Sequence, residues 1–114
     1  MDEKKTNKKR IYGLPKTTID AINSIFINYP QIEKAILYGS RARGNFRNGS
    51  DIDLTLIGYD LSFSVLSKIE WELDDLLLPY KIDLSNYATI KNEDLLENID
   101  QIGKVFYEKE KIVR

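Results

Sequence analysis

The sequence contains no cysteine and no histidine. Without cysteine, the chain cannot form disulfides, thiolate nucleophiles or cysteine-based zinc sites. Without histidine, it cannot build a Ser-His-Asp triad, use a histidine general base or hold most transition metals. Any general base or metal ligand must therefore be an aspartate, glutamate, lysine or tyrosine side chain.

Long apolar runs are also missing. No segment approaches the ~20 apolar residues that a membrane span needs, and the basic N-terminus is not followed by the apolar stretch of a signal peptide. We therefore expect a cytoplasmic protein without a membrane partner. The net charge of −1 argues neither for nor against binding to nucleic acid. We expect no direct contact between this protein and nucleic acid.

The chain of 114 residues has the length and composition of one globular domain, with 42% apolar and 31% charged residues. We expect a flexible basic N-terminus over residues 1–12, because lysine and arginine crowd the first ten positions. Gly13, Leu14 and Pro15 then interrupt the chain. Residues 13–114 form the expected single domain.

Apolar residues at three- and four-residue spacing predict three longer helices. Thr17 or Thr18 can cap the first one, and Pro30 follows its end. The predicted helices cover residues 19–29, 62–78 and 91–102. The inward stripe of the second helix is expected to contain Phe63, Leu66, Ile69, Leu73, Leu76 and Leu77.

Short apolar or alternating runs predict strands at residues 35–38, 51–57 and 80–86. A brief helical turn over residues 40–43, closed by Gly44, follows the first strand. An apolar run at residues 105–107 closes the domain before a charged tail. The alternation of helices and strands predicts a two-layer α/β (α+β) domain with a small sheet.

Asp51 and Asp53 lie two positions apart at the start of a predicted strand. Side chains alternate along a strand, so both carboxylates point to one face. Two like charges at that spacing repel each other, and a divalent cation removes the conflict. Mg²⁺ favours one or two carboxylates together with water and substrate phosphates. The pair suits a metal shared with a nucleotide, and a solvent-facing polar edge is the alternative.

Asp83 supplies a third carboxylate and shares one face of its predicted strand with Lys81 and Ser85. An adjacent strand could place it beside the first two aspartates. Three carboxylates can hold two metal ions about 3.5–4 Å apart. Asp83 is then the candidate to receive a proton from an acceptor hydroxyl. Taken alone, it would be an ordinary edge aspartate.

Gly39 and Ser40 lie at a predicted strand-to-helix junction. A helix N-terminus presents free N–H groups that favour phosphate, and Ser40 adds a hydroxyl donor. A plain N-cap serine is the alternative. Arg41 and Arg43 diverge on a helical turn, so we expect only one of them to reach a phosphate. Surface solvation explains the other, and Arg47 in the following loop could also reach one.

These residues together resemble a known family. Gly39 and Ser40, ten further residues, the DID of residues 51–53 and a later aspartate in KIDLSNY resemble the DNA polymerase β nucleotidyltransferase superfamily. GLP before the first helix, and GSRARG with SDIDL, resemble its minimal nucleotidyltransferases, the MNT proteins. The resemblance covers residues 12–107 and implies a nucleotidyltransferase fold, a small mixed sheet flanked by helices.

The resemblance also implies a reaction. A nucleoside monophosphate, expected to be AMP from ATP, would pass to a hydroxyl in the presence of Mg²⁺, with two ions expected, and pyrophosphate would leave. By position, the catalytic and metal-binding residues would be Asp51, Asp53 and Asp83, with Asp83 as the base. The nucleotide-binding residues would be Gly39, Ser40, Arg41 and Arg43.

MNT proteins are often paired with a HEPN-domain partner. The resemblance therefore implies an antitoxin that transfers AMP to a tyrosine of a HEPN ribonuclease toxin. One alternative is a non-catalytic antitoxin that neutralises its partner by contact alone. Another is a small-molecule transferase of the aminoglycoside nucleotidyltransferase type. No sequence feature identifies the base of the nucleotide.

Overall fold

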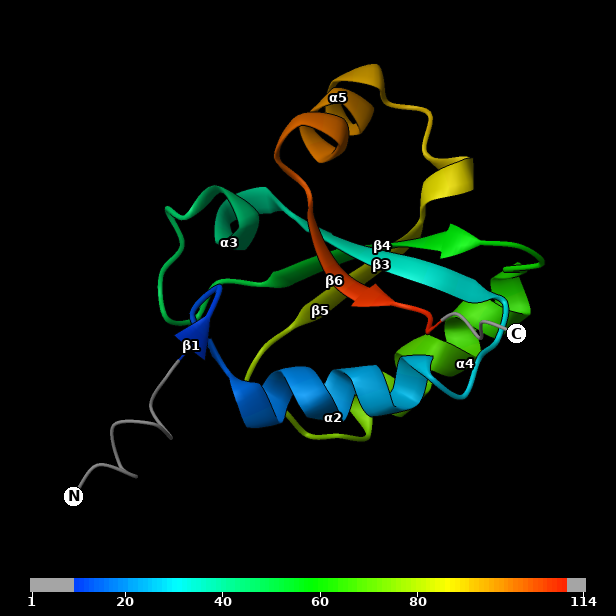
Figure 1. Cartoon of the computed structure of the whole chain (residues 1–114), viewed down its shortest axis with the longest axis horizontal. Helices are drawn as coiled ribbons and strands as arrows, with labels where there is room; N and C mark the ends of the chain where they lie inside the picture. Colours follow the sequence, from blue (N-terminus) through cyan, green and yellow to red (C-terminus); the bar gives the residue numbers. More distant parts are fainter. Residues whose placement is uncertain (1–9, 111–114) are drawn as a thin grey trace.

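The computed structural model describes residues 10–110 (Figure 1). Over this range a four-stranded sheet has the order β5-β4-β3-β6, and β1 and β2 form a separate hairpin. None of the helices in this range is long and apolar enough to span a membrane. The strands are β1 (Arg10–Ile11), β2 (Leu14–Pro15), β3 (Ile32–Tyr38), β4 (Ile52–Gly58), β5 (Ile82–Asn86) and β6 (Lys104–Glu108). The helices are α2 (Lys16–Phe26), α3 (Gly39–Arg43), α4 (Phe63–Asp74), the 3₁₀ turn η1 (Tyr87–Thr89) and α5 (Glu93–Ile102).

The sheet is mixed. β3 runs antiparallel to both β4 and β6, whereas β4 and β5 are parallel. Parallel neighbours need a crossover connection, and α4 supplies it between β4 and β5. The fold class expected from the sequence, a small mixed sheet flanked by helices, is confirmed.

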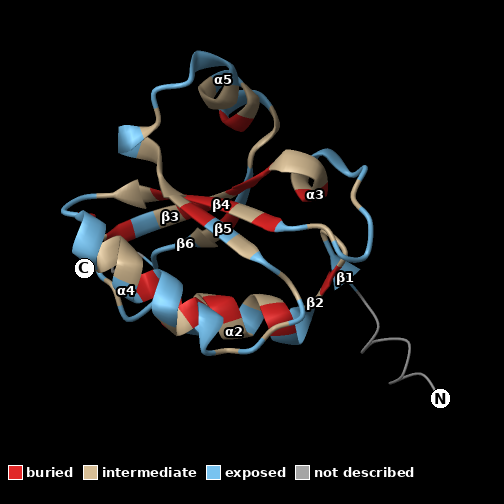
Figure 2. Ribbon diagram, turned by 180° about the vertical axis from the view of Figure 1, so that it is seen from behind, coloured by how far each residue is buried: buried red, intermediate tan, exposed pale blue. Residues whose placement is uncertain are grey.

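Helices lie on both faces of the sheet: α2 and α4 on one, α3 and α5 on the other (Figure 1). The apolar core fills the α2/α4 side, where buried residues line the sheet and the inner side of α2 (Figure 2). The sequence predicted two layers, whereas the structure adds a partial third layer formed by α3 and α5 (Figure 1). The buried core residues are Leu14, Ile22, Ile25, Phe26, Ile32, Ala35, Leu37, Ile52, Leu54, Leu56, Leu61, Ile69, Leu73, Leu84 and Phe106.

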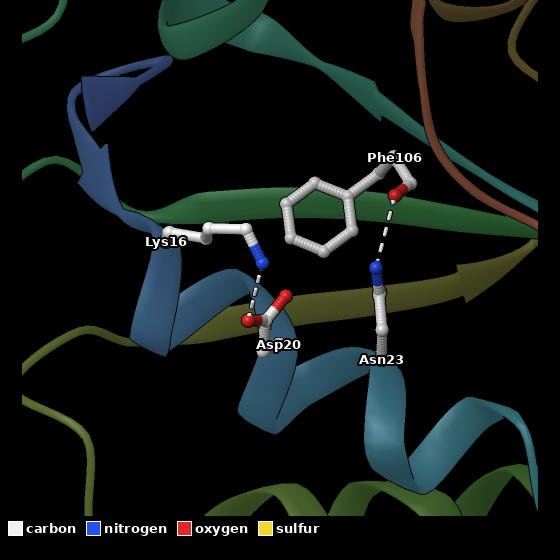
Figure 3. A network of polar contacts seen from close by, with 4 residues as sticks. All are labelled: Lys16, Asp20, Asn23 and Phe106. Carbon is white, nitrogen blue, oxygen red and sulfur yellow. Dashed lines mark hydrogen bonds and ion pairs between the residues drawn. The ribbon is translucent and has the colours of Figure 1, made fainter. Parts of the chain in front are cut away.

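The C-terminal apolar run differs from its prediction, because it forms strand β6 against β3. Phe106 is buried, and the ring of Tyr107 lies 5.6 Å from the ring of Phe26. From α2, the Asn23 side-chain nitrogen donates to the Phe106 carbonyl oxygen at 3.3 Å (Figure 3). A strand this short is fixed by its long-range partner rather than by a local pattern, which explains why the sequence did not predict it.

Helix α4 ends at Asp74, earlier than predicted. Leu77 has a φ of +55°, in the left-handed region that an α-helix does not use. The early end lets Leu76 and Leu78 pack against the core. Phe63 and Leu77 are 86% and 87% exposed, so their prediction as inward residues is wrong.

The described part of the N-terminal segment forms the β1–β2 hairpin. Its two turn residues, Tyr12 and Gly13, have φ values of +59° and +77°, the left-handed pair of a tight hairpin turn. Residues 1–9 of the predicted flexible N-terminus lie outside the described residues. Helix α2 begins directly after Pro15 without a side-chain cap, so the predicted threonine cap is absent and Thr18 is instead buried.

Candidate active site

Asp53 and Asp83 are paired directly across the parallel strands β4 and β5. On the other side of β4, Asp53 is paired with Tyr38, the last residue of β3. Residues paired in this way share one face of a sheet. Tyr38, Asp53 and Asp83 therefore form a row on the α3/α5 face, and the strand adjacency that the sequence allowed is realised.

The electrostatics of this row disfavour negative charge. Burial raises the pKa of the Asp53 carboxyl, and the neighbouring carboxylates of Asp83 and Asp51 raise it further, whereas Lys81 acts in the opposite direction. Asp51 precedes β4 directly and is exposed. A cation bound here would relieve both the desolvation and the repulsion.

Gly39 brings the backbone of the β3–α3 junction against Asp53. Its φ is +75°, a conformation that favours glycine. A Cβ atom at this position would collide with the Asp53 carboxylate oxygen Oδ2. Ser40 follows in the first turn of α3 and is half-buried. The N-cap position belongs to Tyr38, which makes no side-chain cap, so Ser40 does not have the plain capping role.

A polar pair lies beside the carboxylates on the same face. Thr55 and Ser85 are also paired, two positions beyond the aspartates along β4 and β5. Ser85 Oγ donates to Thr55 Oγ1 at 2.9 Å, and Thr55 is fully buried. Strand alternation in the sequence placed Ser85 on one face with Asp83 but gave it no role. Tyr38 was missed, because it ends an apolar run; burial raises the pKa of its phenol.

The two predicted nucleotide-binding arginines lie in different environments. Arg41 is 2% exposed, and its guanidinium donates to backbone carbonyl oxygens of Tyr12, Asn48 and Ser50. These internal hydrogen bonds use the donors of the Arg41 guanidinium, whereas a side chain that binds phosphate was expected to be accessible. Arg43 is exposed on α3. Of the two, Arg43 is thus the one free to turn toward a ligand, and its contact with a nucleotide stays a prediction.

The carboxylates fit a metal that shares its coordination with a substrate. Within residues 10–110, no three acidic side chains converge into a ready metal cage. Mg²⁺ does not require one, since it takes one or two carboxylates and keeps water and phosphate ligands. The paired Asp53 and Asp83, both oxygen donors, match that requirement, and the number of ions stays a prediction.

Comparison with known proteins agrees with this geometry. The family model "Polymerase beta, Nucleotidyltransferase" matches residues 20–112. The chain belongs to this nucleotidyltransferase family. The predicted enzyme class is therefore confirmed, and the match spans the β3–α3 junction and all three aspartates.

A curated relative is similar over much of its length. The nucleotidyltransferase is 35% identical over 77 residues to the "Probable protein adenylyltransferase MntA" of Haemophilus influenzae. The aligned part covers 67% of each chain.

Two solved structures share the fold. One is a toxin–antitoxin crystal structure with AMP-PNP, with a TM-score of 0.65 and 20% identity, covering 80% of this chain and 73% of that one. The other is a tri-AMPylated Shewanella oneidensis HEPN toxin in complex with MNT antitoxin. It has a TM-score of 0.61 and 19% identity, and covers 82% of this chain and 72% of that one.

Proposed function

We propose that this nucleotidyltransferase is a Mg²⁺-dependent protein adenylyltransferase that transfers AMP from ATP to a tyrosine of a HEPN-type toxin, and so acts as its antitoxin. The observation that carries the proposal is the pairing of Asp53 with Asp83, with Gly39 held against Asp53. The names of the relatives support the choice of AMP and of a HEPN partner.

Each residue has a role in this proposal. Asp51, Asp53 and Asp83 would hold Mg²⁺, which supplies charge neutralisation at the transferring phosphate. Gly39 and Ser40, with Arg43 from the same short helix, would contact the triphosphate. The tyrosine oxygen bonds to the α-phosphorus of ATP as the bond to the pyrophosphate oxygen breaks. The tyrosine proton passes to Asp83, which is exposed and can face an acceptor on another protein.

Intact-mass measurement of the partner tests the proposal. After incubation of the chain with a HEPN protein, ATP and Mg²⁺, we expect the partner's mass to rise by one or more AMP units. The double variant Asp51→Asn with Asp53→Asn should lose at least about 100-fold in rate, because metal stabilisation of the transition state amounts to several kcal/mol. A matched control, Asp74→Asn with Asp75→Asn, removes two exposed carboxylates at the end of α4 and should keep the rate.

Each other outcome favours a different function. Neutralisation of the toxin by the double variant, with no mass change, would indicate an antitoxin that acts by contact. Transfer of labelled nucleotide to a small acceptor without any protein partner would indicate a small-molecule transferase. Full activity of the double variant would contradict the assignment of the metal site.

A further inference from the structure

Arg41 is the largest fully buried side chain among residues 10–110. Its Nε and Nη2 donate to the Ser50 carbonyl oxygen at 3.1 and 3.0 Å. Nη2 also donates to the Asn48 carbonyl oxygen at 3.1 Å, and Nη1 donates to that of Tyr12 at 2.9 Å. A buried charge is stable only when it is paired or fully hydrogen-bonded, and these carbonyl groups meet that need.

Two aromatic rings enclose the same guanidinium. Its central carbon lies 5.1 Å from the ring centroid of Phe46 and 5.1 Å from that of Tyr80, which is cation–π distance. Gly13 closes the arrangement, because a Cβ there would collide with the Phe46 ring. We call this group the Arg41 clasp: the guanidinium, the three carbonyl groups and the two rings.

The clasp joins segments that flank the carboxylates. Ser50 directly precedes Asp51, so two hydrogen bonds fix the backbone from which Asp51 projects. Tyr80 precedes the strand that carries Asp83, and the Ile52 N–H donates to the Lys81 carbonyl oxygen at 2.9 Å. Tyr12 adds the turn of the N-terminal hairpin. One side chain thus holds the loop of residues 44–51 to two other segments.

We propose that Arg41 is a positioning residue for the metal site, because its clasp holds the loop of residues 44–51 so that Asp51 stays beside Asp53. The inference rests on the proposed function in one respect, the use of Asp51 as a metal ligand. Lysine cannot replace this arginine, since an ammonium group lacks the planar fork of donors that reaches three carbonyl groups at once.

Titration with Mn²⁺ in the presence of AMP-PNP tests the clasp without an acceptor protein. We expect Arg41→Lys to raise the half-saturating Mn²⁺ concentration about 10-fold and Arg41→Met up to about 100-fold, the range seen when groups supporting metal ligands are removed. Hydrogen exchange of residues 45–51 should accelerate in both variants. The control Ile22→Ala removes a fully buried side chain of α2. It should lower stability while changing the Mn²⁺ concentration less than about 2-fold.

A second variant keeps the test decisive if the Arg41 variants fail to fold. Gly13→Ala retains the arginine but pushes on Phe46, and it should also raise the half-saturating Mn²⁺ concentration. Wild-type Mn²⁺ binding in folded clasp variants, or an equal change in Ile22→Ala, would overturn the inference. If instead the wild-type protein binds Mn²⁺ but transfers no AMP, the proposed function is contradicted, whereas the role of the clasp in metal binding is not.

Discussion

The two faces of the sheet differ in chemistry although the same strands build both. One cross-strand row, on the α2/α4 face, consists of Leu37, Leu54 and Leu84, all buried. The adjacent row, on the α3/α5 face, consists of Tyr38, Asp53 and Asp83. A step of one residue along β4 therefore crosses from the core to the candidate site. Stability and chemistry should be separable by substitutions at neighbouring positions.

The largest stability effect is expected on the apolar face. Leu54→Ala should lower the free energy of unfolding by about 2–5 kcal/mol, since it leaves a cavity at a fully buried position. Urea unfolding measures the loss. The fraction that remains folded should bind ATP and Mg²⁺ as the wild type does. A folded Leu54→Ala protein that has lost nucleotide binding would show that the two faces are not independent.

On the polar face, Gly39→Ala should lower stability and weaken nucleotide binding together. The left-handed backbone costs a non-glycine residue about 1–2 kcal/mol, and the new methyl group would displace the Asp53 carboxylate. Thermal unfolding and calorimetric titration with AMP-PNP and Mg²⁺ measure the two effects. Gly49→Ala is the control, because a Cβ there meets no atom within 4 Å. Equal behaviour of both variants would contradict the close contact with Asp53.

Tyr29 tests the same separation of the two faces, because its hydroxyl makes a polar contact on the apolar α2/α4 side. Its hydroxyl donates to Glu72 of α4 at 3.0 Å. Burial first, and then the bond to Glu72 and its charge, raise the pKa of Tyr29 from 10.0 to about 12. Because the pKa is raised in the folded protein, the contribution of the protonated Tyr29 hydroxyl to the stability of the fold is present below pH 10. It disappears as the pH rises through 12.

Tyr29→Phe should therefore lower stability by about 0.5–1.5 kcal/mol at neutral pH and leave AMP transfer unchanged. The difference from the wild type should vanish at strongly alkaline pH. Spectrophotometric titration of the tyrosines, with unfolding measured at each pH, checks both statements. A pH-independent difference would rule out the phenol as its source.

The smallest expected effect has the opposite sign. Asp53→Asn should stabilise the metal-free protein by about 0.2–1 kcal/mol, the size of interactions between partly exposed charges. The pKa of Asp53 is raised in the folded protein, so its charge destabilises the fold at neutral pH. The higher stability of the variant should fade as the pH falls below 3.8, the ordinary pKa of an aspartate carboxyl, because the wild-type carboxyl is then also protonated. Mg²⁺ should raise the melting temperature of the wild type but not that of the variant. If the variant is less stable than the wild type in EDTA, the statement that the Asp53 charge destabilises the metal-free fold is contradicted.

Local patterns predicted much of the fold correctly. The alternation of β4 and β5 identified which side chains face the core, and apolar spacing located α2, α4 and α5. The errors lie where distant contacts decide. β6 depends on pairing with β3, and the early end of α4 depends on the packing of Leu76 and Leu78.

The candidate site was predictable in part for the same reason. Asp53, Asp83 and Gly39 stand out as residue types that are unusual in their local context. The burial of Arg41 left no such signal, since the sequence GSRARG offers two arginines that look alike. Their different environments arise only when the loop of residues 44–51, the hairpin and the segment before β5 meet.

By itself, the sequence determined the face on which Asp53 and Asp83 lie, because strand alternation depends only on neighbouring backbone units. It also limited the chemistry available, since without cysteine and histidine any general base or metal ligand must be an aspartate, glutamate, lysine or tyrosine. Only the tertiary structure decided that Asp53 stands beside Asp83, that Gly39 touches Asp53 and that Arg41 is turned inward. Register and long-range contacts depend on how all the elements pack together, and no local stretch of sequence encodes that.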